Sequence, residues 1–341
     1  MLEDPYPAFR TLRELGPAAY LEHHGVWFLG RYGVVRDSLG DWRTFSSAQG
    51  IGLNDTINRA WSNELVDRLI GSASFDAVVE LAHDLPVNIL MDLVGWPPAV
   101  RQRPLQLSDG SFDTCGPENA RMQTAMIKIG EMMQLITEIY DSVALTPGGF
   151  GTTIADAARA GHIAREAAIG MLAGYVVAAF DTTIAGIGSG VWLFARHPEQ
   201  WDRVRVDAAL VPRAFNEILR LETPIQHFSR VATRDVDLGE GVVIPAGARA
   251  IVSYAAANRD PRQFAEPDRF DVARANGGTH LAFGAGNHAC AGQSLAKLEA
   301  HAVFRALARR VRRFELAGAL QRTPYNMTRA FSRVPVRVLS H

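Results

Sequence analysis

The stretch Phe283 to Gly292 reads FGAGNHACAG and contains Cys290, one of only two cysteines in 341 residues. Glycines at 284, 286 and 292 surround it, and glycine lets a backbone approach a flat ligand closely and adopt positive φ. The residues from Gln293 onward have a helical pattern, so free N–H groups are expected to face the sulfur and favour a thiolate. Such a thiolate is a nucleophile, a redox sensor or a metal ligand, and a buried structural cysteine is the alternative.

The composition is that of an ordinary globular protein, with 48% hydrophobic residues, 21% charged residues and a formal net charge of -1. This balance does not steer the chain toward nucleic acid or an anionic membrane. Two cysteines are too few for a disulfide framework, and the first residues lack the pattern of a secretory signal. The apolar run 167–180 is shorter than a bilayer span of about 20 residues and indicates a buried helix. We therefore expect a reduced, cytoplasmic protein with no membrane anchor.

Hydrophobic periodicity predicts helices over 78–95, 122–144, 162–198 and 294–311, with short β signals near the start, over 231–260 and at the end. The fold class is therefore mainly α with a small β portion. We expect a single domain over 1–341, with a helical core over about 74–220 and 288–311. The β-rich portions are expected at about 17–36, 228–256 and 312–341.

The pattern F-G-x-G-x-H-x-C-x-G, matched by Phe283, Gly284, Gly286, His288, Cys290 and Gly292, resembles the haem-ligand loop of cytochrome P450 monooxygenases. The resemblance implies the fold of that family, a triangular helical prism, and haem b as cofactor. It further implies that Cys290 is the axial ligand of the haem iron, that Phe283 packs beside the sulfur, and that His288 reaches a haem propionate. Thiolate donation to iron promotes O–O cleavage in such proteins.

A second resemblance lies within 162–198, where the sequence reads AAFDTTIAGIG. An acid and hydroxyls in an apolar helix are costly unless they serve a purpose, and a threonine hydroxyl can bond to an earlier carbonyl. A partly exposed polar stripe is the simpler alternative. The segment is similar to the oxygen-activating helix of the family, which implies space above the iron at Ala178 and proton relay by Asp181 and Thr182.

Two further segments match the family in the same order. Glu217 and Arg220 lie three residues apart in NEILRLETP, where they can pair on one helix face, and an ordinary surface pair is the alternative. The resemblance implies a buried structural lock that Arg269 of FAEPDRF completes. It also implies that Arg230 binds a haem propionate, because guanidinium suits a bidentate carboxylate.

The chain departs from the family after about residue 56. The family places a loop over the substrate and a helix with an H-x-x-x-R pattern there, but residues 56–73 contain no such pattern. Either this loop and helix are deleted, or the sequence omits a stretch. A deletion would open one side of the haem pocket.

The substrate-facing segments look closest to bacterial members that act on para-substituted benzoates. That likeness implies an apolar pocket lined by Phe112, Cys115, Ala179 and Phe180, although each of these residues could be plain core. A flat aromatic substrate would suit such a pocket.

The sequence thus predicts a monomeric haem-thiolate monooxygenase that hydroxylates or O-demethylates a small aromatic substrate. The resemblance implies electrons from NAD(P)H through a ferredoxin and a ferredoxin reductase. The alternatives are a haem-binding protein without turnover, and a peroxide-using peroxygenase, which the acid–alcohol pair disfavours.

Overall fold

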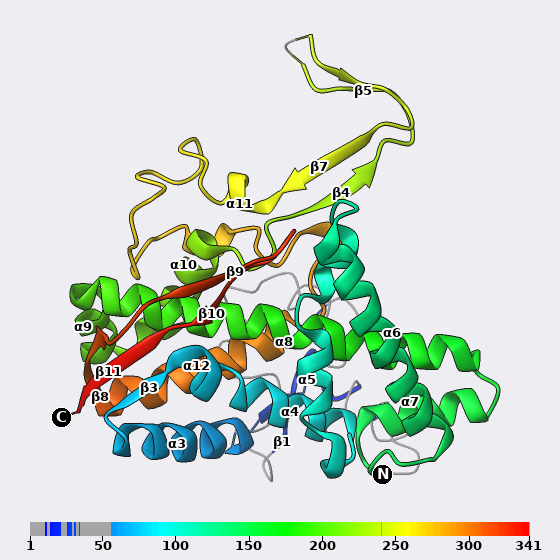
Figure 1. Ribbon diagram of the computed structural model, residues 1–341, viewed down its shortest axis with the longest axis horizontal. Helices are drawn as coiled ribbons and strands as arrows, with labels where there is room; N and C mark the ends of the chain where they lie inside the picture. Colours follow the sequence, from blue (N-terminus) through cyan, green and yellow to red (C-terminus); the bar gives the residue numbers. More distant parts are fainter. Residues whose placement is uncertain are drawn as a thin grey trace. The chain divides into compact units, whose positions relative to one another are not determined.

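The computed structural model describes residues 11, 14–21, 26–28, 31, 34, 56–239 and 241–340 (Figure 1). They fall into two compact units, Met1–Ile57 and Asn58–His341. In the first unit, β1 (Ala19–Leu21) pairs with β2 (Val26–Phe28) in an antiparallel hairpin. The predicted β-rich portion at about 17–36 lies only partly within the described residues.

Helices make up most of the second unit, as the sequence predicts. The α-helices are α3 (Thr56–Gly71), α4 (Asp84–Val94), α5 (Arg103–Ser108), α6 (Ala120–Asp141), α7 (Phe150–Arg159), α8 (Arg165–Arg196), α9 (Pro198–Val206), α10 (Val211–Glu222), α11 (Tyr254–Ala257) and α12 (Gln293–Arg310). The shorter π and 3-10 helices are η1 (Ala77–Ala82), η2 (Pro98–Val100), η3 (Ser111–Cys115), η4 (Ala208–Leu210), η5 (Gly277–Thr279) and η6 (Gly286–His288).

Local sequence sets several of these boundaries. The Asp76 carboxylate accepts hydrogen bonds from the amides of Val78 and Val79 and caps η1, and the Asn119 side chain caps α6 through the Met122 amide. Gly95, at φ +82°, ends α4 in the left-handed conformation that glycine adopts most readily. These are the start and stop signals of the predicted helical segments.

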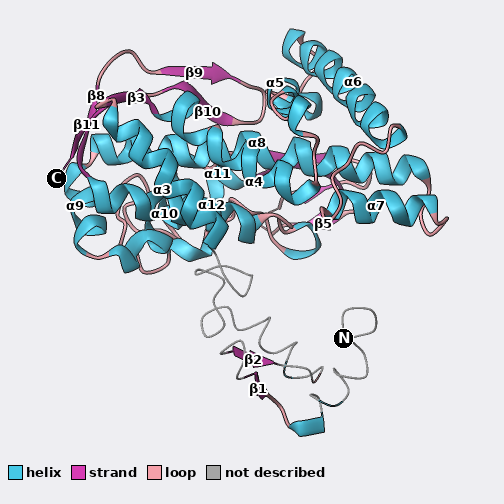
Figure 2. Ribbon diagram, turned by 90° about the horizontal axis from the view of Figure 1, so that it is seen from below, coloured by secondary structure: helices cyan, strands magenta, loops and turns pink. Residues whose placement is uncertain are grey.

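The strands form small antiparallel sheets. They are β3 (Ser74–Asp76), β4 (His227–Val231), β5 (Val236–Asp237), β6 (Val243–Ile244), β7 (Arg249–Ser253), β8 (Val311–Leu316), β9 (Gln321–Pro324), β10 (Arg329–Arg333) and β11 (Pro335–Ser340). Strand β11 lies between β3 and β8, and the pairs β4–β7, β5–β6 and β9–β10 are two-stranded. Figure 2 shows β3, β8 and β11 gathered at the end of the helical unit that carries the C-terminus. The predicted fold class, mainly helical with small sheets, is confirmed.

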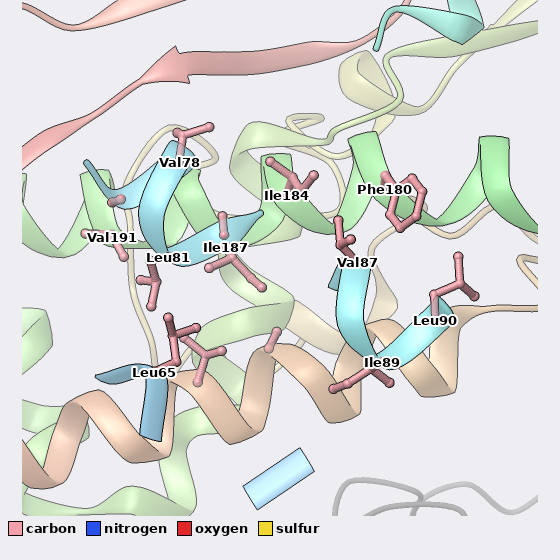
Figure 3. Close-up of a cluster of buried hydrophobic side chains, with 14 of the residues drawn as sticks. Leu65, Val78, Leu81, Val87, Ile89, Leu90, Phe180, Ile184, Ile187 and Val191 are labelled. Carbon is pink, nitrogen blue, oxygen red and sulfur yellow. The ribbon is translucent and has the colours of Figure 1, made fainter. Parts of the chain in front are cut away.

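Helix α8 is the central element of the unit. It contacts η1, α4, α6, α7 and α10, and also β8 and β10. Figure 3 shows Phe180, Ile184, Ile187 and Val191 of α8 against side chains of η1 and α4. At Gly188 a Cβ atom would lie 2.9 Å from Val78 Cγ2, so glycine allows this close packing. Among the described helices, α8 alone has the length and hydropathy of a membrane span, but these contacts identify it as a core helix, as predicted.

Helix α3 occupies the region where the family pattern fails. Near its middle, Asn63 accepts a hydrogen bond from Arg309 at 2.8 Å, and Asp67 pairs with Arg310. Residues 56–71 therefore form a helix that packs on the end of α12.

Candidate functional site

The cysteine loop is a compact turn that ends at the first residue of α12. Gly284 and Gly286 have φ of +67° and +66°, whereas Gly292 has φ of −86°. The predicted need for positive φ therefore holds at two of the three glycines. The Cys290 amide donates to the Phe283 carbonyl at 2.8 Å and closes the turn. A Cβ at Gly284 would lie 3.2 Å from the His288 carbonyl oxygen, so glycine is also needed there for space.

The thiol of Cys290 is free and lies in an exposed residue. The protein atoms around the sulfur raise its pKa, although the amides of Gly292 and Gln293 and the charge of Lys297 lower it in part. The amides at the start of α12 thus lower the pKa of this thiol, as the sequence predicts, but partial desolvation outweighs them and the net shift is upward. A coordinating metal ion would remove this proton.

Phe283, the first residue of the loop, lies next to the imidazole of His280. The centres of the Phe283 and His280 rings lie 5.7 Å apart, and Lys297 Nζ lies 5.1 Å from the centre of the Phe283 ring. Burial lowers the pKa of His280 to about 3, so this imidazole is neutral and its Nδ1 accepts from the Ala282 amide at 3.1 Å. Sequence reasoning missed His280, although it precedes the motif by only three residues.

The two predicted propionate ligands are both exposed. Arg230 lies on β4 and donates to the Ser229 carbonyl at 2.8 Å, and His288 ends η6. Both side chains are thus accessible to a ligand from outside, but their role toward a propionate stays a prediction.

On α8 the acid and the alcohol have different partners. Thr182 Oγ1 donates to the Ala178 carbonyl at 3.2 Å, which is the backbone contact expected for threonine in a helix. Asp181 Oδ2 accepts from the Gly110 amide at 3.1 Å. Burial and the negative charge of Asp109 raise the pKa of Asp181 to about 7. Asp181 therefore exchanges a proton near neutral pH, as an acid–base group requires.

An accessible stripe of small residues runs along the same helix. Gly174 and Ala178 are exposed and Thr182 is half-buried, at a spacing of four residues that puts them on one face. Small side chains on an accessible face leave room for a ligand. The Ala178 prediction is consistent with this placement.

The predicted lock exists but has a different third member. Arg220 donates to both Glu217 oxygens, at 2.8 and 2.9 Å, and both side chains are fully buried. The second guanidinium is that of Arg274, at 2.9 and 3.1 Å from the two oxygens. Arg269 was the wrong choice: its side chain pairs with Glu266, and only its carbonyl reaches the lock, by accepting from Arg220 and Arg274.

The predicted substrate residues do not come together as one pocket wall. Phe112 is half-buried with its ring 6.2 Å from that of Phe228, and Cys115 is exposed. Phe180 is 0% exposed and lies in the hydrophobic core, so its assignment to a pocket wall is wrong. Ala179 packs against the same core. Helical geometry explains the error, because residue 180 is two positions from both Ala178 and Thr182 and therefore lies on another face of α8.

The donor set fits a haem better than an all-protein metal site. Among the described residues, no group of three or more His, Cys, Asp or Glu side chains could hold a metal ion. A single accessible thiol suits an ion whose other ligands come from a macrocycle. Exposed Arg230 and His288 suit its carboxylates, and an added Cβ at Gly286 would meet no atom within 4 Å, which leaves space beside the loop.

Comparisons with known proteins agree with this geometry. A family model described as Cytochrome P450 matches residues 161–338. The chain is 33% identical to Cytochrome p450 CYP199A2 of Rhodopseudomonas palustris over 377 residues, which cover 98% of this chain and 91% of the relative. It is 30% identical to the Cytochrome P450 monooxygenase PikC of Streptomyces venezuelae, with the same coverage of 98% and 91%. The crystal structure of P450BioI with an acyl carrier protein has a TM-score of 0.76 at 24% identity over 99% of both chains, which supports the fold alone.

The alignment with the Rhodopseudomonas protein also bears on the departure after residue 56. Its 377 positions exceed the 341 residues of this chain, so it includes residues of the relative that have no counterpart here. This agrees with a shorter chain, and the position of the loss stays a prediction.

Proposed function

We propose, on the premise that this chain belongs to the cytochrome P450 family, that this monooxygenase hydroxylates or O-demethylates a small benzoate-like aromatic substrate. One atom of O2 enters the substrate and the other leaves as water, and two electrons and two protons are consumed. The observation that supports the chemistry is the accessible Cys290 thiol, held by a glycine loop at the start of α12.

The family uses haem b and takes electrons from NAD(P)H through redox partners. When bound, the haem supplies an iron centre that activates O2, and thiolate ligation favours cleavage of the O–O bond. In our proposal Cys290 would bind the iron, and Arg230 and His288 would donate to the propionates. Gly284 and Gly292 would keep the loop narrow beside the macrocycle, and Phe283 would shield the sulfur.

Asp181 and Thr182 are proposed to manage protons at the site where O2 would bind. Because burial raises its pKa to about 7, Asp181 can gain or lose its proton near neutral pH. The Thr182 hydroxyl donates to Ala178, so its oxygen remains able to accept a hydrogen bond. Ala178 leaves space for O2 on the accessible face of α8.

The substrate class rests on aromatic side chains that lie near one another. The ring of Phe228 is 6.2 Å from both Phe112 and Tyr254, with edge-to-face angles of 64° and 68°. Phe112 and Phe228 are half-buried. Rings at such angles can accept a flat substrate ring, and we propose that Phe112 contacts it.

We further propose that a ferredoxin and its reductase are the redox partners, and that the chain acts as a cytoplasmic monomer with one catalytic domain. Residues 285–292 of the cysteine loop are exposed, which leaves this surface open to such a donor.

The ligand assignment is tested by the spectrum of the reduced protein under carbon monoxide. A thiolate-ligated haem gives a red-shifted Soret band, and Cys290→Ala should abolish it. Cys115→Ala is the matched control, because Cys115 is the other exposed cysteine. A Cys290→Ala protein that keeps the band would refute the assignment.

Turnover separates the proposal from its rivals. With ferredoxin, reductase and NADH, 4-methoxybenzoate should stimulate NADH oxidation and give the demethylated product. Haem uptake with no substrate-dependent NADH oxidation would indicate a haem-binding protein. Product formed from hydrogen peroxide without any reductase would indicate a peroxygenase.

A further inference from the structure

Three side chains from separate elements meet beside Asp181. Asp109 follows α5, Lys128 lies on α6, and Tyr325 follows β9. Lys128 Nζ lies 2.8 Å from Asp109 Oδ2 and 3.0 Å from the Asp109 carbonyl oxygen. The Tyr325 hydroxyl donates to Asp109 Oδ1. We name Asp109, Lys128 and Tyr325 the Asp109 clamp. Asp109 is thereby held at both carboxylate oxygens and at its backbone.

The clamp is connected to the acid through one residue. Gly110 follows Asp109, and its amide is the group that donates to Asp181 Oδ2 at 3.1 Å. Gly110 has φ of +75°, and a Cβ there would lie 3.1 Å from Tyr325 Cε1. The Tyr325 ring therefore packs against Gly110 while its hydroxyl holds Asp109. Fixing Asp109 fixes the direction of the next amide.

We propose that the Asp109 clamp positions the Gly110 amide on Asp181 and thereby sets how readily Asp181 passes protons to the oxygen site during turnover. This rests on the proposed monooxygenase function. The three members are positioning residues, because among the described contacts they reach Asp181 through Gly110 and through charge.

The surrounding charges explain why the position matters. Burial and Asp109 raise the pKa of Asp181, and the Gly110 amide and Lys128 lower it. Asp113 raises it slightly and Tyr325 also faces it. Behind these groups, His83 faces Asp109 and Arg121 faces Asp113. Loss of the amide contact would therefore raise the pKa of Asp181.

Tyr325→Phe is the decisive variant. It removes the hydroxyl that holds Asp109, keeps the ring against Gly110 and changes no charge at neutral pH. A change at Asp181 in this variant therefore reports position and not Coulomb energy. Lys128→Gln removes the Lys128 contacts with Asp109 together with a positive charge. Lys128→Arg should restore both the contact and the charge. Arg165→Gln is the matched control, because it breaks an exposed ion pair between α8 and Asp141 of α6.

The first readout does not depend on activity. The Gly110 amide is followed by NMR in glycine-selective 15N-labelled full chain, with its signal identified by its loss of titration in Asp181→Asn. In the parent it should titrate near pH 7, and Tyr325→Phe should move the midpoint upward by about 0.5–1 unit, well within the range of shifts that hydrogen bonds cause. The same titration can be recorded on chain without haem, so it stands if the proposed function fails.

The second readout is product formed per NADH consumed, with ferredoxin and reductase present. Tyr325→Phe and Lys128→Gln should lower this ratio about threefold, far less than the roughly 10²–10⁴-fold contribution of an acid–base group itself. Lys128→Arg and Arg165→Gln should match the parent. If Tyr325→Phe matches Arg165→Gln in both the NMR midpoint and the coupling ratio, the clamp has no positioning role. If the parent chain shows no turnover but the midpoint moves, the monooxygenase proposal fails and the clamp remains.

Discussion

Glu217 on α10 and Asp181 on α8 are both carboxylates within helices, and the protein treats them in opposite ways. Glu217 accepts from the guanidiniums of Arg220 and Arg274 and from the Asp271 amide. Among the described residues, Asp181 accepts from the Gly110 amide alone. A carboxylate with several charged donors is a fixed counter-ion, whereas one with a single neutral donor can exchange its proton near pH 7.

The difference separates stability from chemistry. The Glu217 lock ties α10 to the backbone at 258, 267 and 269, because Arg220 donates to those three carbonyls. Asp181 lies instead on the helix face that also carries accessible Ala178. The same functional group therefore holds the fold in one place and remains available for proton transfer in the other.

Glu217→Gln should have the largest effect and tests whether Glu217 stabilises the fold. It leaves two guanidiniums facing a neutral amide in a buried site, and loss of one partner of a buried pair typically costs about 3–5 kcal/mol. Urea unfolding of the full chain measures the loss. Glu138→Gln, at the exposed end of α6, should stay within about 0.5 kcal/mol. Equal unfolding free energies for the two variants would contradict the lock.

Arg274→Ala and Arg269→Ala test the corrected membership of the lock. Arg274 bonds Glu217 with a side chain only 10% exposed, so its loss should cost about 2–3 kcal/mol. The Arg269 side chain is 57% exposed and pairs with Glu266, so Arg269→Ala should cost less than about 1 kcal/mol. Paired thermal unfolding curves measure both. The reverse order would restore Arg269 as the third member.

Asp181→Asn should increase the free energy of unfolding, whereas the lock variants should decrease it. The pKa of Asp181 is raised from 3.8 to about 7, so the folded state binds this proton more tightly than the unfolded state does. The group therefore lowers stability progressively as pH rises from about 4 to about 7. The variant should match the parent near pH 4 and exceed it at pH 8 by about 1–2 kcal/mol, since one pKa unit corresponds to about 1.4 kcal/mol and partial access to water reduces the effect. Unfolding free energies that differ equally at both pH values would argue against a shifted Asp181.

Thr182→Ala should have the smallest effect on the free energy of unfolding, but it should clearly lower the amount of product formed per NADH consumed. Its hydroxyl is half-buried and donates only to a helix carbonyl among the described residues, so the free energy of unfolding should shift by less than about 0.5 kcal/mol. If Thr182 manages protons, more NADH is then consumed per product. Thr182→Ser, which keeps the hydroxyl, serves as the control. Unchanged coupling in Thr182→Ala would remove the proton role from Thr182.

Sequence reasoning succeeded where the relevant residues are close along the chain. The Glu217–Arg220 pair lies within one short segment, where residue types and spacing are visible, and it is confirmed as a buried ion pair. Cys290 and the Asp181–Thr182 pair also lie in short segments, and their roles stay predictions. Sequence reasoning failed for the third member of the lock, because Arg269 and Arg274 are five residues apart on a segment whose backbone direction was unknown. It also failed for Phe180, whose helix face depends on which elements cover α8.

The protonation of the Cys290 thiol could not be predicted from the sequence either. A helix start predicts a thiolate at Cys290, but partial burial of the thiol raises its pKa. The Asp109 clamp joins residues 109, 128 and 325, which no local pattern connects.

By itself the sequence determined the family, the iron ligand expected from it and the order of the helices, because local hydrophobic period and contiguous motifs carry that information. Only the tertiary structure decided which guanidinium neutralises Glu217, which face of α8 is accessible and why Asp181 titrates near neutral pH. Those properties depend on distances between atoms far apart in the chain, and on the water that packing excludes from between them.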